Sequence, residues 1–387
     1  MHIATEAQIK GGRITDVYFT RAEQILRAHH VRTAVTAEFV VKRLPPGYAF
    51  GVLAGIEEAA ELLRAIPGIE VETMEEGTLF GPEQPVMTIR GRYLDFGRFE
   101  TALLGLLCQA SGIATRAARC RLAAGKRWLL SFGARRVHPA IAPMVERAAY
   151  LGGCDGVSVV ECASRLGLQA TGTIPHALVL LMGDAAWTIK AFDRLIPRSV
   201  KRVALIDTIG DEKFEAIACA EALGRNLFGV RFDTPASRRG DFAALLREVR
   251  WELDLRGHRH VKLLVSGGID EEKIRDLNSV CDGYGVGTAL SNAPVLDLAM
   301  DLVEIGGRPM AKRGKPSGRK QVFRCPRCLA TVVAPWGRPA RRLCRCRAAC
   351  RPLLQPLIRR GTLMRALPTA HVIRKRVLEQ LATMRGQ

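Results

Sequence analysis

The fold class is decided at Val261-Lys262-Leu263-Leu264-Val265-Ser266-Gly267-Gly268-Ile269-Asp270, where a short apolar strand runs into two glycines and then into the start of a helix. The same pattern follows at Tyr284-Gly285-Val286-Gly287-Thr288-Ala289. Glycine lets a backbone approach a ligand closely, and the amides at a helix start can bind phosphate. Either turn alone is as well explained by a tight change of chain direction, but two in succession favour a phosphate site.

Around this pair the chain alternates short apolar strands with helices. Strands are expected at residues 128–132, 156–160, 203–207, 228–232, 261–265 and 283–286. Helices are expected between them at residues 139–150, 175–182, 211–223, 241–255 and 271–277. This repeated order is typical of a parallel sheet. Since polar and glycine residues directly follow the strands, where barrel enzymes place their sites, we predict a closed or nearly closed α/β barrel, with an open doubly wound sheet as the alternative.

The first 110 residues have a mixed pattern. An amphipathic helix is expected at residues 56–65, and short strand-like runs follow at 69–72 and 86–90, punctuated by glycine and proline. We therefore expect a compact N-terminal α/β domain over residues 1–110 and the barrel over residues 111–307.

Positive charge is concentrated at the C-terminal end. The chain carries 58 Lys and Arg against 38 Asp and Glu, a net charge of +20. Residues 308–387 contain 21 of the basic residues and one acid, Glu379, so the remainder is balanced with 37 of each sign. A change of composition on this scale predicts a domain boundary near residue 307 and a separate basic, cysteine-rich domain over residues 308–387.

Cysteines in that basic segment have the spacing of metal ligands. Cys325 and Cys328 form a CxxC pair, and Cys344, Cys346 and Cys350 follow it. Clustered cysteines more often hold a metal, whereas the six scattered ones are expected to be small buried residues. Tetrahedral zinc takes four thiolates, so Cys325, Cys328 and Cys344 are joined by either Cys346 or Cys350. A site filled in this way makes the Zn²⁺ structural rather than catalytic.

Titratable side chains are expected near the ends of several barrel strands. His176 falls in the first turn of a helix, where the dipole and free amides favour a negative group such as a phosphate on the imidazole; a packed or surface histidine is the alternative. Asp207 and Asp233 end two strands, and Arg231 projects on the same side as Asp233. The carboxylates could hold Mg²⁺, accept from ribose hydroxyls or orient a histidine, or form an internal salt bridge.

Two arginines follow the first barrel strand, in Phe132-Gly133-Ala134-Arg135-Arg136. Two guanidinium groups could hold a planar carboxylate in bidentate fashion, and a nearby aromatic ring could stack on a pyridine. A solvated arginine pair is the alternative.

The chain also has no run near the ~18 apolar residues needed to span a bilayer, and its first residues lack a signal-peptide pattern, so we expect a cytoplasmic protein without membrane contact.

Several segments recur together in one known family. They are 15–18, 99–104, 132–136, 147–153, 172–176, 231–241, 266–268 and 285–288, among them Arg231-Phe232-Asp233-Thr234-Pro235-Ala236-Ser237-Arg238-Arg239-Gly240-Asp241. In this set and order the chain resembles the nicotinate phosphoribosyltransferase family, in its short microbial form with a C-terminal zinc domain. The resemblance extends from residue 15 to about residue 300. Motifs of the dehydrogenase-type dinucleotide fold and of the Walker A loop are absent.

The resemblance implies a type II phosphoribosyltransferase fold: an N-terminal α/β sandwich, an irregular α/β barrel, and a homodimer or larger homo-oligomer with shared active sites. It implies an enzyme of NAD biosynthesis and pyridine nucleotide salvage. Such an enzyme forms nicotinate mononucleotide and pyrophosphate from nicotinate and phosphoribosyl pyrophosphate, with Mg²⁺ at the reaction site and with ATP as a co-substrate.

The resemblance also implies roles for individual residues. Tyr18 comes from the neighbouring subunit and packs on the pyridine ring, while Phe132 stacks on the other face. Arg135 holds the nicotinate or its phosphoribosyl partner. His176 is phosphorylated by ATP, and Asp207 orients it. Contacts to pyrophosphate, ribose and the 5′-phosphate are implied for Arg231, Asp233, Ser266, Gly267, Gly268, Gly287 and Thr288, and Arg136 and Ser158 complete the expected substrate site.

The chain departs from the family pattern in two places. A Thr-Ser-Asn-like run is expected after Gly156, but Val157-Ser158-Val159 stands there, so the serine is kept and the amide is lost. Pro175 occupies a position where a small residue is usual. Both departures concern substrate choice and ATP coupling rather than the fold.

Three other functions match parts of the sequence less well. A quinolinate phosphoribosyltransferase needs a denser cluster of Lys and Arg around the pyridine and has no matching phospho-histidine. An acidic side chain near position 158 would favour a nicotinamide-specific enzyme, but Ser158 stands there and does not favour it. A basic zinc-knuckle protein could instead bind nucleic acid through the C-terminal segment, but that segment offers only Phe323 and Trp336 for base stacking, which disfavours this function.

Overall fold

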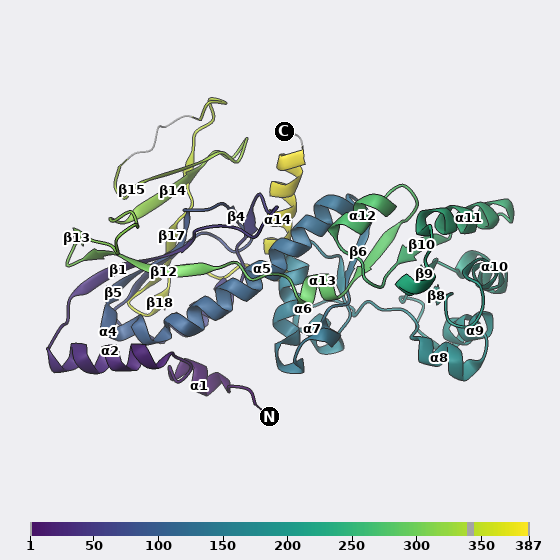
Figure 1. The fold of residues 1–387 in the computed structure, drawn as a ribbon, viewed down its shortest axis with the longest axis horizontal. Coiled ribbons are helices and arrows are strands. Elements are labelled where there is room, and N and C mark those ends of the chain that lie inside the picture. Colours follow the sequence, from purple (N-terminus) through teal and green to yellow (C-terminus); the bar gives the residue numbers. More distant parts are fainter. Residues whose placement is uncertain (1, 339–343, 386–387) are drawn as a thin grey trace. The chain divides into compact units, whose positions relative to one another are not determined.

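The computed structural model describes residues 2–338 and 344–385, and the chain forms two compact units (Figure 1). The first unit contains residues 1–118 together with 294–387, and the second contains residues 119–293. None of the helices in the described ranges is both long and apolar enough to cross a membrane.

The first unit is built on a seven-stranded antiparallel sheet with the strand order β13-β12-β1-β5-β3-β17-β18. The strands are β1 (Ala34–Val41), β3 (Glu70–Thr73), β5 (Pro85–Arg92), β12 (Leu298–Ile305), β13 (Arg308–Pro309), β17 (Gln355–Arg359) and β18 (Thr362–Leu363). Helices α3 (Ile56–Leu63) and α5 (Glu100–Ala124) add apolar side chains to the core cluster of this sheet. The expected mixed α/β class is confirmed, and four strands of this sheet come from residues 298–363 rather than from the first 110 residues.

Strands from both ends of the chain share this sheet. β17 pairs with β3, and β12 pairs with β1, so segments more than 250 residues apart in the sequence lie side by side (Figure 1). Basic residues of the C-terminal segment meet acids of the same unit. The ion pairs are Lys315–Asp301 (2.6 Å), Lys320–Glu38 (2.8 Å), Arg376–Glu75 (2.9 Å) and Arg319–Glu72. Part of the C-terminal charge therefore pairs with acids within this unit.

The second unit contains six parallel strands in the order β7-β6-β11-β10-β9-β8. They are β6 (Trp128–Ser131), β7 (Gly156–Val157), β8 (Val203–Leu205), β9 (Gly229–Phe232), β10 (Lys262–Val265) and β11 (Gly283–Val286). Strands β8 to β11 follow one another, and the last pairs with β6, which is the connectivity of a barrel rather than of a doubly wound sheet. Among the described strands, β7 and β8 each pair with one neighbour only and form the two open edges of the sheet. The barrel is therefore partial.

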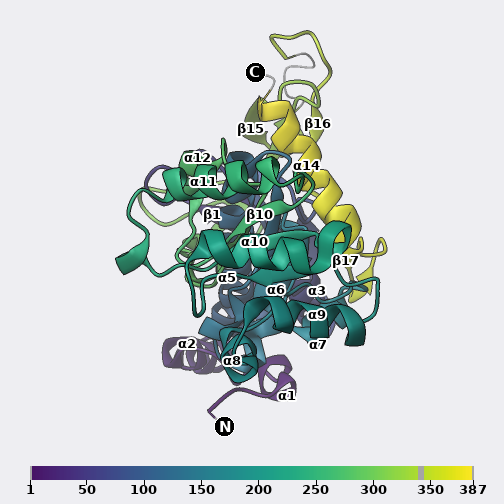
Figure 2. The same cartoon turned by 90° about the vertical axis from the view of Figure 1, so that its right-hand side faces the viewer.

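All six strands expected from the sequence are present, although β7 ends at Val157. Helices α9 (Ala185–Leu195), α10 (Glu212–Leu223) and α11 (Phe242–Leu255) lie outside the sheet (Figure 2). Two glycines of β11 make room inside the barrel. A Cβ on Gly283 would lie 2.7 Å from Trp128 Cβ, and one on Gly285 would lie 2.3 Å from Phe132 Cε2. Neither position could carry a side chain while the side chains of Trp128 and Phe132 keep their places.

One titratable group of the first unit gives a pH-dependent prediction. Burial, followed by the charges of Asp301 and Asp16, raises the pKa of Glu100 from 4.5 to about 7. The Glu100 carboxyl group therefore binds its proton more tightly in the folded state than in the unfolded state. The stabilisation that results is lost as the pH rises from the unfolded-state pKa of 4.5 through about 7. After allowance for solvent screening, Glu100→Gln is expected to raise the melting temperature at pH 8 by a few degrees, for about 1 kcal/mol.

At pH 4.5 the same substitution should change the melting temperature little, because Glu100 is then neutral in the folded protein. Thermal unfolding at the two pH values measures this difference. Glu272 is exposed to solvent, so Glu272→Gln is the control and should show no such pH dependence. An equal effect of Glu100→Gln at both pH values would contradict the assignment.

Candidate functional site

A connected group of polar side chains lies at the carboxyl ends of three neighbouring strands. Asp207 follows β8, Asp233 follows β9, and Ser266 follows β10. The Asp233 backbone N–H donates to Asp207 Oδ2 at 3.2 Å, and the Ser266 hydroxyl donates to Asp233 Oδ1 at 2.8 Å. His176 Nε2 lies 3.4 Å from Asp207 Oδ1. The parallel strands thus bring together four residues that are far apart in the sequence.

His176 is the first residue of α8 (His176–Met182), and Pro175 is its N-cap, one position earlier in the helix than expected. The His176 side chain is 41% exposed, whereas that of Asp207 is 1% exposed. Burial raises the pKa of Asp207, and the nearby His176 acts in the opposite direction. An accessible imidazole beside a buried carboxylate is an arrangement in which the carboxylate can orient the ring.

Several buried polar atoms around this group have no hydrogen-bond partner among the described residues. They are Arg231 Nε, Thr173 Oγ1 and Thr208 Oγ1, whereas Asp207 Oδ1 has only its 3.4 Å contact with His176 Nε2. Burial lowers the pKa of Arg231, while Asp233, whose Oδ2 lies 3.8 Å from the guanidinium, acts against that shift. An unsatisfied buried polar group costs about 1–3 kcal/mol. Three such atoms beside this group indicate that a polar ligand completes the site.

The turn after β10 has the conformation of an anion cradle. Gly267 (φ +78°) and Gly268 (φ +62°) are both left-handed. The Arg239 guanidinium donates to the carbonyls of Ser266 (3.0 Å) and Gly267, and Lys273 Nζ donates to the carbonyl of Gly268 at 2.7 Å. The N–H groups of Gly267 and Gly268 have no partner among the described residues. Successive free amides of this kind form an anion-binding concavity.

The turn after β11 lies next to this cradle in the sheet order. Gly287 is the N-cap of α13 (Thr288–Ser291), so the amides of Gly287 and Thr288 stand at a helix start without intrahelical acceptors. The pairing of β10 with β11 places the two glycine turns on neighbouring strands, as the sequence pattern predicts.

Phe132 and Arg231 line one small cavity inside the barrel. Its lining residues are Trp128, Leu130, Phe132, Thr173, Arg231, Leu264, Val265, Tyr284 and Gly285. Arg135 and Arg136 lie outside this lining, exposed in the short 3-10 turn at Ala134–Arg136. Tyr18 belongs to α2 (Val17–Ala28) of the first unit and is 58% exposed.

A buried glutamate that sequence reasoning missed holds the neighbouring loop. Glu146 of α6 (Ala142–Leu151) is fully buried, accepts from the Ser131 hydroxyl at 2.7 Å and accepts from the Ser158 backbone N–H at 2.7 Å. Burial raises the pKa of Glu146, and these hydrogen bonds counteract the rise. Glu146 therefore fixes the ends of β6 and β7. Arg239 was also given no role from the sequence. Glu146 and Arg239 act through contacts that the local sequence pattern does not reveal, and only the arginine run 238–239 pointed to one of them.

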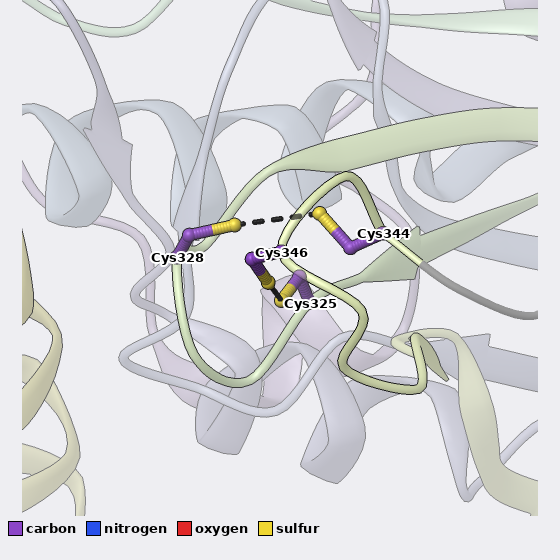
Figure 3. Close-up of side chains that lie close together, drawn as sticks. All are labelled: Cys325, Cys328, Cys344 and Cys346. Carbon is purple, nitrogen blue, oxygen red and sulfur yellow. Dashed lines mark hydrogen bonds between the residues drawn. The ribbon is translucent and has the colours of Figure 1, made fainter.

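Four cysteines of the C-terminal segment form a compact group (Figure 3). The sulfur atoms of Cys325, Cys328, Cys344 and Cys346 all lie within 4.8 Å of one another, and Cys350 is not a member of the group. Cys325 and Cys346 are 3.3 Å apart, and Cys328 and Cys344 are 3.5 Å apart. Although burial opposes ionisation, hydrogen bonds from the Cys328 backbone and the Cys346 thiol help to lower the pKa of Cys325 to about 6. Four converging thiols fit the ligand set of tetrahedral zinc.

Comparisons with known proteins agree with this architecture. The family models for the N-terminal and C-terminal domains of quinolinate phosphoribosyl transferase match residues 16–111 and 113–301. A nicotinate phosphoribosyltransferase of Mycobacterium tuberculosis is 31% identical over 380 residues, covering 86% of this chain and 83% of that protein. The nicotinate phosphoribosyltransferase of Bacillus subtilis is 29% identical, covering 80% of this chain and 72% of that protein.

Solved structures show the same fold over the whole chain. The nicotinate-nucleotide pyrophosphorylase of Pyrococcus furiosus is 50% identical, with a TM-score of 0.97 and coverage of 100% of this chain and 98% of that one. Human nicotinic acid phosphoribosyltransferase has a TM-score of 0.75 at 23% identity, covers 96% of this chain and 94% of that one, and supports the fold alone. On the sequence matches and the shared fold, this chain is a phosphoribosyltransferase and belongs to the nicotinate phosphoribosyltransferase family.

Proposed function

We propose that this enzyme forms nicotinate mononucleotide and pyrophosphate from nicotinate and phosphoribosyl pyrophosphate, and that it couples this reaction to ATP hydrolysis. The observation that carries the proposal is the connected group of His176, Asp207, Asp233 and Ser266 beside the free amides of the glycine cradle. This arrangement offers an accessible imidazole, carboxylates for ribose hydroxyls and an anion site for the 5′-phosphate within one unit.

In this reaction the pyridine nitrogen forms a bond to C1 of the ribose while the bond from C1 to the pyrophosphate oxygen breaks, and the electron pair leaves with pyrophosphate. No protein nucleophile is needed, so positioning and charge stabilisation carry the catalysis. Arg231 would offer its unpaired Nε to the departing pyrophosphate, while Asp233 and Ser266 hold the sugar and its phosphate. Asp207 and Asp233 would hold Mg²⁺, which stabilises negative charge on the leaving group when bound.

Nicotinate rather than quinolinate is favoured as the pyridine substrate. His176, 3.4 Å from Asp207, matches the phospho-histidine implied for a nicotinate enzyme, which a quinolinate enzyme lacks. The relatives named nicotinate phosphoribosyltransferase support the same choice, while the matched family models name quinolinate and keep that substrate as the alternative to test.

ATP coupling is proposed to run through His176. Transfer of the γ-phosphoryl group of ATP to the imidazole would form a phosphorus–nitrogen bond and release ADP, and water would later cleave that bond to give phosphate. Asp207 would orient the ring through the contact at His176 Nε2. Exposure of 41% of the His176 side chain supports access by a nucleotide.

The test uses purified enzyme with labelled nicotinate, phosphoribosyl pyrophosphate and Mg²⁺, with and without ATP. ATP is expected to increase nicotinate mononucleotide formation in the native enzyme. His176→Ala should lower the rate with ATP to the rate measured without it, since the phosphoryl acceptor is lost. His260→Ala, which removes an exposed histidine bonded to the Gly224 carbonyl, is the matched control and should keep the full response to ATP.

Other outcomes separate the alternatives. Product from quinolinate or nicotinamide but not from nicotinate would keep the fold and overturn the substrate. An ATP response that survives in His176→Ala would remove the phospho-histidine from the scheme. No product from any of the three pyridines would overturn the proposed reaction.

Two structural proposals accompany the reaction. The four grouped thiols of Cys325, Cys328, Cys344 and Cys346 would hold a structural Zn²⁺. The enzyme would work as a homodimer or larger homo-oligomer in which Tyr18 of one subunit reaches the pyridine bound by its neighbour, a role supported by its exposure of 58%. Turnover in a mixture of Tyr18→Ala and Asp233→Asn, each expected to lower turnover by itself, measures such sharing, because mixed dimers would regain one intact site.

A further inference from the structure

A second cavity lies at the opposite end of the parallel strands from the glycine cradle. Its volume is about 410 Å³, and its lining residues are Lys126, Arg127, Trp128, Phe228, Lys262, Leu264, Cys281 and Asp282. Except for Leu264, these residues stand at the first position of a barrel strand or within two residues before it. Because parallel strands all begin at one end of a barrel, this second cavity lies away from the strand-end residues proposed for the reaction, although Trp128 and Leu264 also line the small cavity inside the barrel.

Two aromatic rings form one wall of the second cavity. Trp128 at the start of β6 and Phe228 just before β9 are stacked, with ring centroids 4.8 Å apart and planes 23° apart. The ammonium group of Lys201, just before β8, lies 3.3 Å from the Trp128 centroid and 4.3 Å from the Phe228 centroid. Both rings are only partly buried, so this wall offers an aromatic surface next to a cation.

Positive charge exceeds negative charge around the second cavity. Lys262 pairs with Asp282 at 3.2 Å. Arg127 uses Nε to donate to the Cys281 carbonyl at 2.9 Å, which is a neutral partner. In the described parts of the chain, neither Lys126 nor Lys201 has a carboxylate within ion-pair distance, and burial lowers the pKa of Lys201 without an acid to oppose it. A cavity with this surplus is suited to an anion.

We propose that the second cavity binds a nucleotide, whose phosphate meets Lys126, Arg127 and Lys201 and whose base lies against Trp128 and Phe228. The volume falls within the range of about 300–1,000 Å³ typical of small-molecule sites. Ammonium groups without a carboxylate partner select phosphate, and an aromatic wall selects a planar ring. The site goes beyond the proposed reaction and does not rest on it, since binding can be measured without any substrate.

The test measures binding of adenosine monophosphate and of inorganic phosphate to the full-length protein by isothermal titration calorimetry at low ionic strength. The double variant Lys126→Glu/Lys201→Glu is expected to weaken adenosine monophosphate binding by about tenfold or more, since two attractive charges become repulsive. Lys190→Glu, an exposed lysine of α9, is the control for charge reversal and should bind as the native protein does.

Asp233→Asn separates this second cavity from the reaction site, because adenosine monophosphate binding at the second cavity should survive that substitution. Phe228→Leu should weaken adenosine monophosphate binding while leaving inorganic phosphate binding unchanged. Three results would overturn the proposal: absence of adenosine monophosphate binding, binding that survives the double charge reversal, or binding of adenosine monophosphate no tighter than that of inorganic phosphate. The double variant should keep the native turnover rate, which also establishes that it is folded.

Discussion

Asp233→Asn is expected to lower kcat/KM for nicotinate mononucleotide formation by about 100-fold or more, an effect comparable to removal of one preorganised catalytic group. Asp233 accepts from the Ser266 hydroxyl, and its other oxygen lies 3.8 Å from the guanidinium of Arg231. Asparagine keeps the shape of the side chain and removes its charge. The variant therefore loses the carboxylate proposed for the ribose and for Mg²⁺, while the buried cation loses its nearby counter-charge.

Steady-state kinetics with varied phosphoribosyl pyrophosphate measures this effect, and thermal unfolding checks that the variant is folded. Asp241→Asn is the matched control. Asp241 is an exposed helix N-cap that accepts from the Ala244 amide, and asparagine caps helices as well as aspartate does. If both variants retain kcat/KM within about twofold, a difference of only ~0.4 kcal/mol, Asp233 has no role at the reaction centre.

Cys325→Ser is expected to abolish zinc binding and to destabilise the C-terminal segment by about 4 kcal/mol or more, since loss of a metal is among the largest single-site effects. Cys325 is fully buried directly after β14 (Lys320–Arg324), which pairs with β15 (Thr331–Pro335) and β16 (Arg351–Pro352). This three-stranded sheet is small, so a metal joining its connecting turns would contribute much of its stability.

Cys350→Ser provides the matched control for this prediction. Cys350 lies in the same segment but outside the group of four sulfurs, so its variant should keep one zinc per chain and the native melting temperature. Metal analysis of the purified proteins, together with unfolding in the presence of a chelator, makes the comparison. Zinc retained in Cys325→Ser, or zinc lost in Cys350→Ser, would contradict the proposed ligand set.

The sequence by itself was sufficient for the elements of the barrel. Short apolar runs such as Lys262–Val265 are strands because they are bounded by glycine and helix signals, and their spacing requires helical crossovers. Once the strands are parallel, residues that follow them must share one end of the sheet. This local rule brought Asp207, Asp233 and the two glycine turns together. The N-terminal sheet was less accessible, because its antiparallel partners come from both ends of the chain.

Only the tertiary structure decided features that depend on distant partners. Glu146 on α6 accepts from Ser131 of β6 and from the Ser158 amide after β7, and nothing in its immediate neighbours along the chain signals that role. The grouping of Cys346 rather than Cys350 with the other thiols depends on the path of the connecting turns. Sequence periodicity and spacing report local conformation, and therefore determined the fold class and the strand-end residues. Pairings over long separations are set by three-dimensional packing, which only the tertiary structure contains.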